Sequence, residues 1–315
     1  HIAEVSLPNA VAVINPNRLD EESRHTQLAA VGVSFLLIVA INRALRKDGF
    51  FLKNLSFQEP NLMNLLDIVA LGTVADMVPL TGVNRALVVQ GLKVMAKRRN
   101  KGLSALADVA GMDEAPSTYH LGFLMGPRVN AGGRVGESNL GAKLLSTESS
   151  EEAINIAQKL NNYNAERREI EDIVLKEVLA LAELKAEKKI SQSLVFVAGE
   201  NWHPGVIGII ASRLKERYGL PACILTVQDG VATGSGRSIT GVDLGACVIS
   251  ARQAGILTNG GGHAMAAGFS LGAEKLDIFE EFLSERFGKI IFEKGIMPTL
   301  SVDGLITIEG ASMDL

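Results

Sequence analysis

Hydrophobic positions in the first 147 residues recur mostly with helical spacing. Residues 10–14 (Ala-Val-Ala-Val-Ile) are an exception, because a continuous apolar run before an Asn-Pro-Asn turn predicts a buried strand. A long apolar pattern over about 27–45 predicts a buried helix that is too interrupted to cross a bilayer. Further helices are expected over about 62–75, 83–97, 117–125 and 138–146. These patterns predict the mostly helical part of an α/β domain.

A charged helix separates this part from the next. Ser149 and Glu152 form a capping-box signature, and the helix that they open is expected to continue to about Lys188. Its apolar stripe is short, so we interpret it as a rigid connector between two domains. A coiled-coil partner is the alternative.

Strand and helix patterns alternate from residue 193 onward. Residues 194–197 and 222–225 predict buried strands with a helix over 205–217 between them, which makes a β-α-β unit. Further elements are expected at about 231–233 (strand), 243–254 (helix), 266–270 (strand) and 273–287 (helix). After Pro298 a new alternating run predicts another unit. The expected fold class is α/β, in four regions: 1–147, 148–189, 190–296 and 297–315.

Composition narrows the class of protein. With 315 residues, 47% of them hydrophobic, the chain is long enough for two cores. A net charge of -4 argues against a surface coated with positive charge, although a local basic groove remains compatible with it. Cys223 and Cys247 lack paired spacing, which predicts reduced, buried thiols in a cytoplasmic protein. Because residue 1 is histidine and a pattern breaks off at the end, we expect a fragment truncated at both ends.

Residues 260–268, Gly-Gly-Gly-His-Ala-Met-Ala-Ala-Gly, are the most informative stretch. Glycine lets backbone N–H groups point at an anion, and the imidazole of His263 adds a hydrogen bond or a charge. The stretch therefore predicts a phosphate-binding turn that includes Gly261 and Gly262. A flexible glycine turn leading into a packed strand is the alternative.

Two shorter motifs in the same region carry candidate phosphate ligands. His203 is expected beside the first free N–H groups of a helix, whereas Trp202 is expected to be a core residue. Ser235, Arg237 and Ser238 come at a strand end, where an arginine fork can make two parallel hydrogen bonds to a phosphate. A solvated arginine in a surface turn is the alternative.

A second glycine-rich stretch lies in the first region, at residues 126–134. Arg128, Asn130 and Arg134 in this expected loop suit an anionic backbone. Helix capping by Asn130 with solvent-exposed arginines is the alternative. The basic cluster at 97–101 is expected to be a solvated helix end.

Asp76 differs from these cations, because its carboxylate lies within an apolar segment and burying an unpaired charge is costly. Either local backbone donors satisfy it or it binds a cation, and the residues alone favour the first interpretation. Asp67 is expected in an exposed helical turn, so it offers no second ligand.

Together these stretches resemble the bacterial RecJ family of the DHH phosphoesterase superfamily over nearly the whole chain. The sequence after His1 is similar to the residues that follow the family's Asp-His-His motif, with His1 as its second histidine. Asp76 matches the aspartate of the fourth metal motif, and residues 126–134 match the Gly-Pro-Arg and Asn-Ala-x-Gly-Arg signature. The matches to the DHH-associated domain are Trp202, His203, the helix from Gly205 to Arg213, Arg237, Gly261, Gly262 and His263.

The resemblance implies the C-terminal part of a DHH domain (1–147), a connector helix (148–189), a DHH-associated domain (190–296) and the start of an OB-fold (297–315). It also implies a single-strand-specific 5′–3′ exonuclease of DNA repair and recombination that uses two manganese (Mn²⁺) or magnesium (Mg²⁺) ions. His1 and Asp76 would be metal ligands, and Arg134, Ser235, Arg237 and His263 would hold the terminal phosphate or the adjacent backbone. Single-stranded DNA, a single-strand-binding protein and a helicase are the implied partners, without a membrane.

The chain departs from the family pattern, since the first aspartate motifs and the first part of Asp-His-His are absent. We therefore expect the 315-residue chain as given to be inactive as a nuclease. A DHH-family nano-RNase or 3′-phosphoadenosine 5′-phosphate phosphatase, and a non-catalytic RecJ-like scaffold, are the alternative functions.

Overall fold

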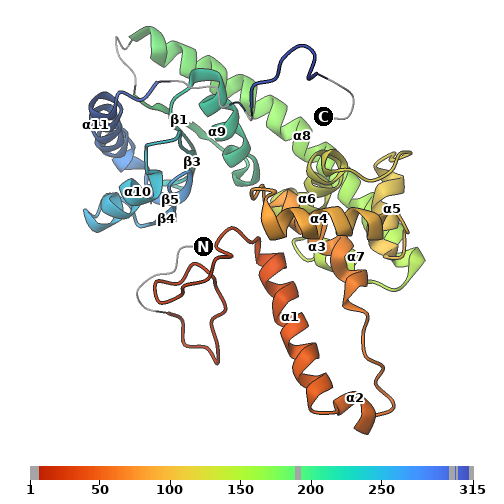
Figure 1. Cartoon of the computed structure of the whole chain (residues 1–315). Coiled ribbons are helices and arrows are strands. Elements are labelled where there is room, and N and C mark those ends of the chain that lie inside the picture. Colours follow the sequence, from red (N-terminus) through yellow and green to blue (C-terminus); the bar gives the residue numbers. More distant parts are fainter. Residues whose placement is uncertain (1–6, 189–192, 298–301, 303, 312–315) are drawn as a thin grey trace. The chain divides into compact units, whose positions relative to one another are not determined.

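The computed structural model describes residues 7–188, 193–297, 302 and 304–311, and the chain divides into two compact units, His1–Ile170 and Glu171–Leu315. Figure 1 shows the helices and strands of both units. The long helix α8 (Ser150–Lys188) belongs to the first unit up to Ile170 and to the second unit beyond it.

The described residues of unit 1 form helices and connections without a strand. The elements are α1 (Ala30–Lys47), α2 (Phe50–Lys53), η1 (Leu62–Leu65), α3 (Leu66–Ala75), α4 (Gly82–Met95), α5 (Lys101–Val109), η2 (His120–Met125), α6 (Gly126–Val135), α7 (Leu140–Ser146) and the first part of α8. The helices predicted over 62–75, 83–97 and 138–146 are confirmed. The strand predicted over 10–14 is wrong: Val11 and Ile14 are exposed, and no strand among the described residues of this unit is there to pair with them.

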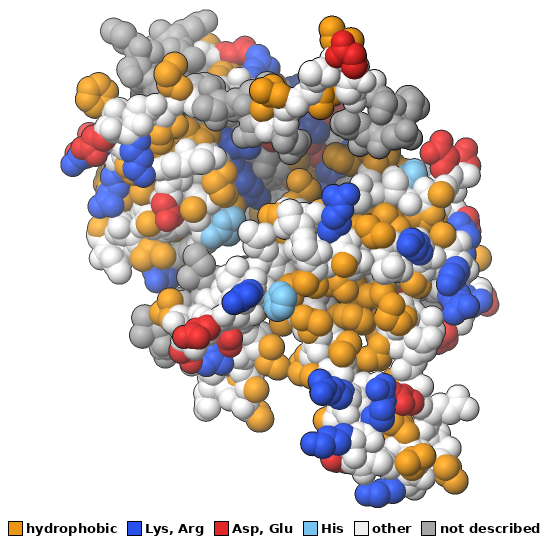
Figure 2. Space-filling model, in the orientation of Figure 1, with side chains coloured by type: hydrophobic (Ala, Val, Ile, Leu, Met, Phe, Trp, Pro, Cys, Tyr) orange, Lys and Arg blue, Asp and Glu red, His pale blue; other side chains and the backbone are white. Residues whose placement is uncertain are grey.

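The helix predicted over 27–45 exists as α1, but the prediction that it is buried is wrong. Only Gly32, Phe35 and Asn42 of this helix are buried. Its exposed apolar side chains are Leu36, Leu37, Ile38, Val39 and Ile41. Figure 2 shows a broad hydrophobic area on unit 1 where α1 lies. Phe35 and Val31 pack with Leu66 and Val69, and this packing accounts for only part of the apolar character of α1.

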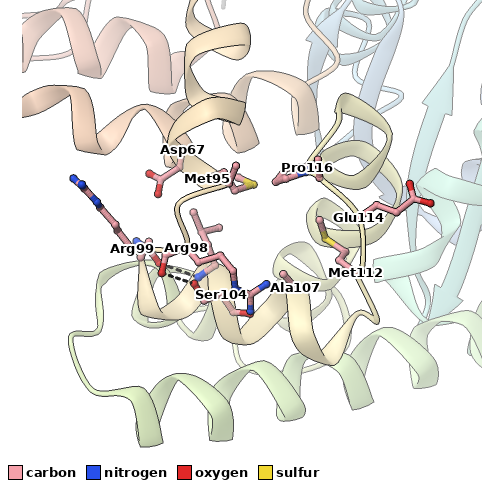
Figure 3. A pocket seen from close by; sticks show the side chains of 13 residues that line it. Asp67, Met95, Arg98, Arg99, Ser104, Ala107, Met112, Glu114 and Pro116 are labelled. Carbon is pink, nitrogen blue, oxygen red and sulfur yellow. Dashed lines mark hydrogen bonds between the residues drawn. The ribbon is translucent and has the colours of Figure 1, made fainter.

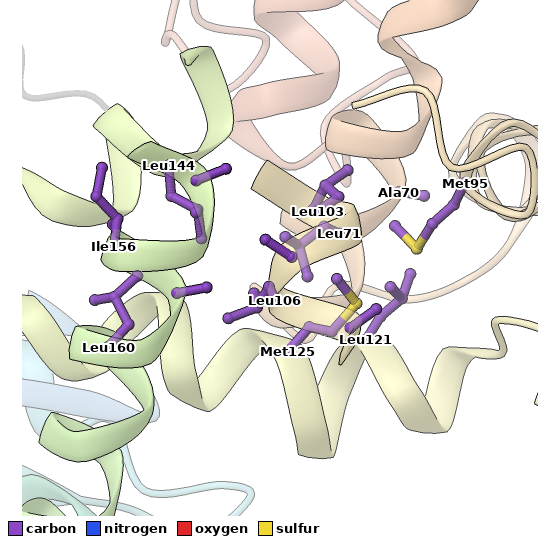
Figure 4. Packing of buried hydrophobic residues seen from close by; sticks show 14 of the residues in the cluster. Ala70, Leu71, Met95, Leu103, Leu106, Leu121, Met125, Leu144, Ile156 and Leu160 are labelled. Atoms are coloured by element: carbon purple, nitrogen blue, oxygen red, sulfur yellow. The ribbon is translucent and has the colours of Figure 1, made fainter. Parts of the chain in front are cut away.

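The core of unit 1 lies between α3, α4, α5, η2, α7 and the first turns of α8. Figure 4 shows Leu71, Leu106, Leu121 and Leu160 among the side chains that fill it. α3 and α4 approach so closely that a Cβ on Gly91 would lie 2.2 Å from the Leu66 carbonyl oxygen. This packing fixes the first turns of α3, and Asp76 follows the other end of the same helix.

Unit 2 combines the second part of α8 with a five-stranded sheet and three further α-helices. The elements are β1 (Val195–Glu200), α9 (Pro204–Tyr218), β2 (Ala222–Gln228), β3 (Val231–Arg237), α10 (Leu244–Gln253), β4 (Asn259–His263), β5 (Ala266–Gly272), η3 (Ala273–Lys275) and α11 (Leu276–Lys294). The strand order is β1-β2-β3-β5-β4, with β1 and β2 parallel and the remaining pairs antiparallel. The predicted α/β class is confirmed.

The two faces of this sheet are covered differently. α10 and α11 pack with Cys223, Ala232 and Phe269 in the core on one face. On the other face, α9 packs over β2 and β3. Because successive strand residues point to opposite faces, this second face also carries Ser235 and Arg237 of β3 and their neighbours in β5 and β4. Most of these positions are exposed or half-buried rather than buried, so the face is open on that side.

The prediction that Cys223 and Cys247 are free and buried is confirmed, and burial raises the pKa of both thiols. Within the described ranges, no helix is long and apolar enough to cross a membrane. Of the region predicted to start an OB-fold, residues 298–301, 303 and 312–315 lie outside the described residues.

Candidate functional site

The glycine-histidine stretch at 260–268 forms a β-hairpin. β4 pairs with β5 from Asn259 opposite Ser270 to His263 opposite Ala266. The predicted turn is therefore wrong in its geometry, because much of this backbone takes part in a strand ladder. The hairpin nevertheless brings Gly261 and His263 onto the open face of the sheet, which carries the remainder of the site.

Strand register places four of the candidate ligands in two adjacent rows. Ser235 lies opposite Gly268, which lies opposite Gly261, and Arg237 lies opposite Ala266, which lies opposite His263. Since neighbouring strands are about 4.8 Å apart, each row spans roughly 10 Å from β3 to β4. The middle strand offers only glycine and alanine here. We call Ser235, Arg237, Gly261 and His263 the open sheet face.

Helix α9 borders the open sheet face at Gly208. A Cβ on Gly208 would lie 2.9 Å from Ser235 Oγ and 3.1 Å from Arg237 Nη2. Arg237 Nη1 in turn donates to Ser235 Oγ at 3.0 Å and to the Gly236 carbonyl at 2.9 Å. Glycine at position 208 thus leaves room for an arginine held in a defined position, which the solvated-turn alternative does not explain.

Both candidate histidines use Nδ1 as an acceptor. His203 is the N-cap of α9, and its Nδ1 accepts from the Gly205 N–H at 3.1 Å, while Nδ1 of His263 accepts from the Met265 N–H at 3.3 Å. An Nδ1 that accepts a hydrogen bond leaves the proton of the neutral ring on Nε2. Each ring therefore presents an N–H donor on its outer nitrogen, which suits a phosphate oxygen.

Three other residues of these motifs have structural roles. Trp202 is buried, as predicted, and its indole N–H donates to Glu177 Oε2 at 2.8 Å. Ser238 is fully buried, and its hydroxyl donates to the Val242 carbonyl at 2.7 Å, so it is turned away from the open sheet face. Gly262 is needed for the hairpin itself, because a Cβ there would lie 2.3 Å from the Ala266 carbonyl oxygen.

In unit 1 the structure brings Asp76 and Asn130 to one cavity of about 370 Å³. Asp76 is the C-cap of α3 and is exposed, so the premise that its carboxylate is buried is wrong. Among the described residues, no backbone donor reaches this carboxylate, and the interpretation favoured by the residues alone is not supported. The rest of the lining is largely apolar and includes Ile68, Leu71 and Val129.

The stretch 126–134, expected to be a glycine-rich loop, is the helix α6. Gly132 is required for packing, since a Cβ there would lie 2.5 Å from the Glu137 carbonyl oxygen. Helical spacing separates the two arginines: Arg134 follows Asn130 by four residues and shares its side of the helix, whereas Arg128 does not. Arg128 donates to Asn161 Oδ1 at 2.9 Å and to the Leu124 carbonyl at 2.8 Å. Burial, assisted by Arg168, lowers the pKa of Arg128.

The predicted metal ligands are only partly described. His1 lies outside the described residues. Within the described part of the chain, no group of three or more His, Cys, Asp or Glu residues is arranged to hold a metal ion. Asp76 thus offers one carboxylate, and the described residues do not complete a metal site by themselves.

Asp67 was expected to be exposed, which is wrong, because only 2% of it is accessible. The sequence did not identify Gly208 as part of the site, and it included Gly268 only as the end of the stretch 260–268. An isolated glycine inside the helical pattern 205–217 is the signal that points to Gly208. No comparable signal marks Gly268, since its relevance depends on strand register.

Comparison with known proteins gives a consistent result. Residues 190–289 match the family model of the DHHA1 domain. The chain is similar to the single-stranded-DNA-specific exonuclease RecJ of Dickeya dadantii, with 40% identity over 295 residues, which cover 92% of this chain and 51% of that protein. Its similarity to RecJ of Escherichia coli is 39% over 300 residues, covering 93% and 51%.

A solved structure shows the same similarity in three dimensions. RecJ from Thermus thermophilus in complex with Mn²⁺ aligns with a TM-score of 0.69 and 29% identity, covering 82% of this chain and 36% of that chain. The chain spans about half the length of the curated relatives that it matches.

Proposed function

We propose that this chain acts in a single-stranded-DNA-specific exonuclease, because it is similar to RecJ exonucleases over most of its length and residues 190–289 match the DHHA1 domain. The proposed reaction is hydrolysis of phosphodiester bonds from a 5′ end, in DNA repair and recombination. The open sheet face carries this proposal most directly, because it combines an arginine, a serine hydroxyl and an imidazole N–H around glycine and alanine. Within unit 1, the candidate residues are Asp76, Asn130 and Arg134.

The chemistry of the open sheet face suits the end of a strand. A 5′-terminal phosphate carries roughly −1.5 to −2 charges near neutral pH, more than an internal phosphodiester. Arg237 offers a guanidinium held at Ser235, and His263 offers an outward Nε2–H donor. Gly261 and Gly268 add no side chain that would keep a phosphate or a ribose away from the strands.

We include divalent metal ions in the proposal, with Mn²⁺ or Mg²⁺ as the candidates. Such ions activate water and stabilise the charge of the departing oxygen when they are bound. Asp76 would supply one ligand and His1 a second, and the described residues do not complete the set. We therefore expect the 315-residue chain to bind DNA without manganese-dependent hydrolysis.

The same relationship extends the proposal to partners and location. A single-strand-binding protein would present the substrate, and a helicase would generate it from duplex DNA. Both act on DNA in the cytoplasm of a bacterial cell, and the buried, free cysteines are compatible with that location.

The test is the salt dependence of DNA binding by Arg237→Ala, measured by fluorescence anisotropy with a 5′-phosphorylated oligonucleotide and EDTA. Loss of one phosphate contact should reduce the log–log salt slope by about 0.7 for a single strand. Between 50 and 200 mM salt, the wild-type affinity would then fall roughly 2.6-fold more than the variant affinity.

Arg217→Ala is the matched control, because Arg217 is exposed and pairs with Glu183 away from the open sheet face. It should leave the slope unchanged. Equal salt slopes for wild type and Arg237→Ala would contradict the proposed DNA contact of Arg237. Manganese-dependent cleavage by the 315-residue chain would contradict the expectation that this chain does not hydrolyse DNA. Preference for a dinucleotide over a long strand would favour the short-substrate alternative.

A further inference from the structure

Unit 1 contains a second cavity, of about 230 Å³, that shares no lining residue with the cavity at Asp76. It lies between the start of α3, the end of α4, α5 and the segment that follows α5. Figure 3 shows Asp67, Met95 and Arg99 on one side, with Met112 and Pro116 on the other. Apolar side chains thus contribute to both sides, Asp67 and Arg99 lie on one side, and Glu114 lies on the other with Met112 and Pro116.

Asp67 is a buried carboxylate that lines this cavity with unused acceptor capacity. Only 2% of the residue is exposed, and its Oδ1 accepts from the Ile68 N–H at 2.7 Å. Among the described residues, only backbone N–H groups donate to this carboxylate, and no side chain bonds to it or forms an ion pair with it. Burial accordingly raises the pKa of this carboxyl group. A buried acceptor of this kind is stabilised by a ligand that brings N–H donors.

Two guanidinium groups line the same cavity. Arg98 adopts a positive φ of 52°, which is unfavourable for a residue with a side chain, and it is held there by Asp108 and the Ser104 carbonyl. Arg99 donates to Asn64 Oδ1 at 3.2 Å. Two adjacent arginines disfavour a simple cation as the ligand of Asp67, and they favour a molecule that also carries a negative group.

The geometry points to a purine nucleotide with a guanine-type edge as the ligand of this cavity. The adjacent N1–H and N2–H₂ donors of guanine match the two oxygens of a carboxylate, and a flat base fits between apolar walls that include two methionines. The phosphate would meet Arg98 and Arg99. The cavity volume is below the usual range for drug-sized ligands, so we expect the base to be enclosed and the sugar phosphate to lie outside.

The experiment is isothermal titration of the 315-residue chain with guanosine 5′-monophosphate (GMP). Inosine 5′-monophosphate, which lacks the 2-amino group, and uridine 5′-monophosphate are the comparison ligands, and guanosine tests the phosphate. Asp67→Asn should weaken GMP binding roughly tenfold or more and remove the preference for GMP over the inosine nucleotide. Arg99→Ala should remove the advantage of GMP over guanosine.

Asp113→Asn is the matched control, because Asp113 is exposed near the cavity and does not line it. It should bind GMP like the wild type. Undetectable GMP binding at millimolar concentration, equal binding of the three nucleotides, or unchanged affinity in Asp67→Asn would each overturn the inference. So would tighter binding of spermidine than of GMP. Should Asp67→Asn fail to fold, the ligand series on the wild type still decides the question.

Discussion

The three consecutive glycines of β4 allow a test that separates the requirements of the fold from those of the ligand. Gly261 is on the open sheet face, and a Cβ there would meet no heavy atom within 4 Å. Gly260 points to the opposite face, where a Cβ would lie 2.8 Å from Val248 Cγ1 and 3.3 Å from Phe269 Cβ. Valine at these two neighbouring positions should therefore have opposite effects.

Gly261→Val should retain or increase stability, because valine favours an extended strand and replaces a flexible glycine, a gain of roughly 0.5–1 kcal/mol. Its methyl groups would lie in the row with Gly268 and Ser235, where the DNA is proposed to approach the strands. Crowding of a close-packed contact costs roughly 1–3 kcal/mol, so the dissociation constant for single-stranded DNA should rise about 5- to 150-fold.

Gly260→Val should show the reverse pattern. Its side chain would crowd the core under α10, and the free energy of unfolding should fall by roughly 1–3 kcal/mol. Urea denaturation followed by circular dichroism measures the stability of both variants, and fluorescence anisotropy with a 5′-phosphorylated oligonucleotide measures binding. Wild-type affinity in Gly261→Val would refute contact between DNA and the open sheet face. A loss of stability in Gly261→Val equal to that in Gly260→Val would show that the glycine serves the fold.

Three further substitutions test other parts of the structure. Asp67→Asn should stabilise the protein at pH 7. Burial raises the pKa of the Asp67 carboxyl group above its ordinary value of 3.8. The stability that protonated Asp67 contributes is therefore lost as the pH rises through this raised pKa, and asparagine does not lose it. The advantage of Asn should shrink toward pH 3.5 in urea denaturation, and a constant advantage would contradict this cause. Met77→Gly should stabilise the protein by roughly 1 kcal/mol in the same assay, because Met77 is exposed and adopts a positive φ of 59° after the end of α3. A loss of stability in this variant would show instead that the Met77 side chain contributes packing. Trp202→Phe should cost roughly 1–3 kcal/mol in thermal unfolding followed by circular dichroism, since it removes the bond to Glu177, and an unchanged midpoint would contradict that role.

Periodicity was sufficient to predict most elements of unit 2, because the described residues of that unit form its core themselves. It failed for residues 10–14 and for the burial of α1. Apolar periodicity reports that a segment has an apolar face, and it does not identify the surface that covers it. The same limit applies to Asp76, whose apolar neighbours indicated burial although the residue follows the end of a helix and is exposed.

Glycine was the residue type whose meaning the sequence left most ambiguous. The stretches 126–134 and 260–268 were both interpreted as anion-binding loops, and they are a helix and a hairpin. Gly132 and Gly262 are explained by neighbouring backbone that a Cβ would meet, and only the folded structure shows those neighbours. The motifs singled out these segments without indicating that one forms a helix and the other a hairpin.

The histidines show why the site was easier to locate than to describe. Sequence motifs placed His203 at a helix start and His263 beside glycine, but the use of their two ring nitrogens depends on backbone donors two residues later in each case. Since both Nδ1 atoms accept from those donors, neutral rings can donate from Nε2 without carrying a positive charge.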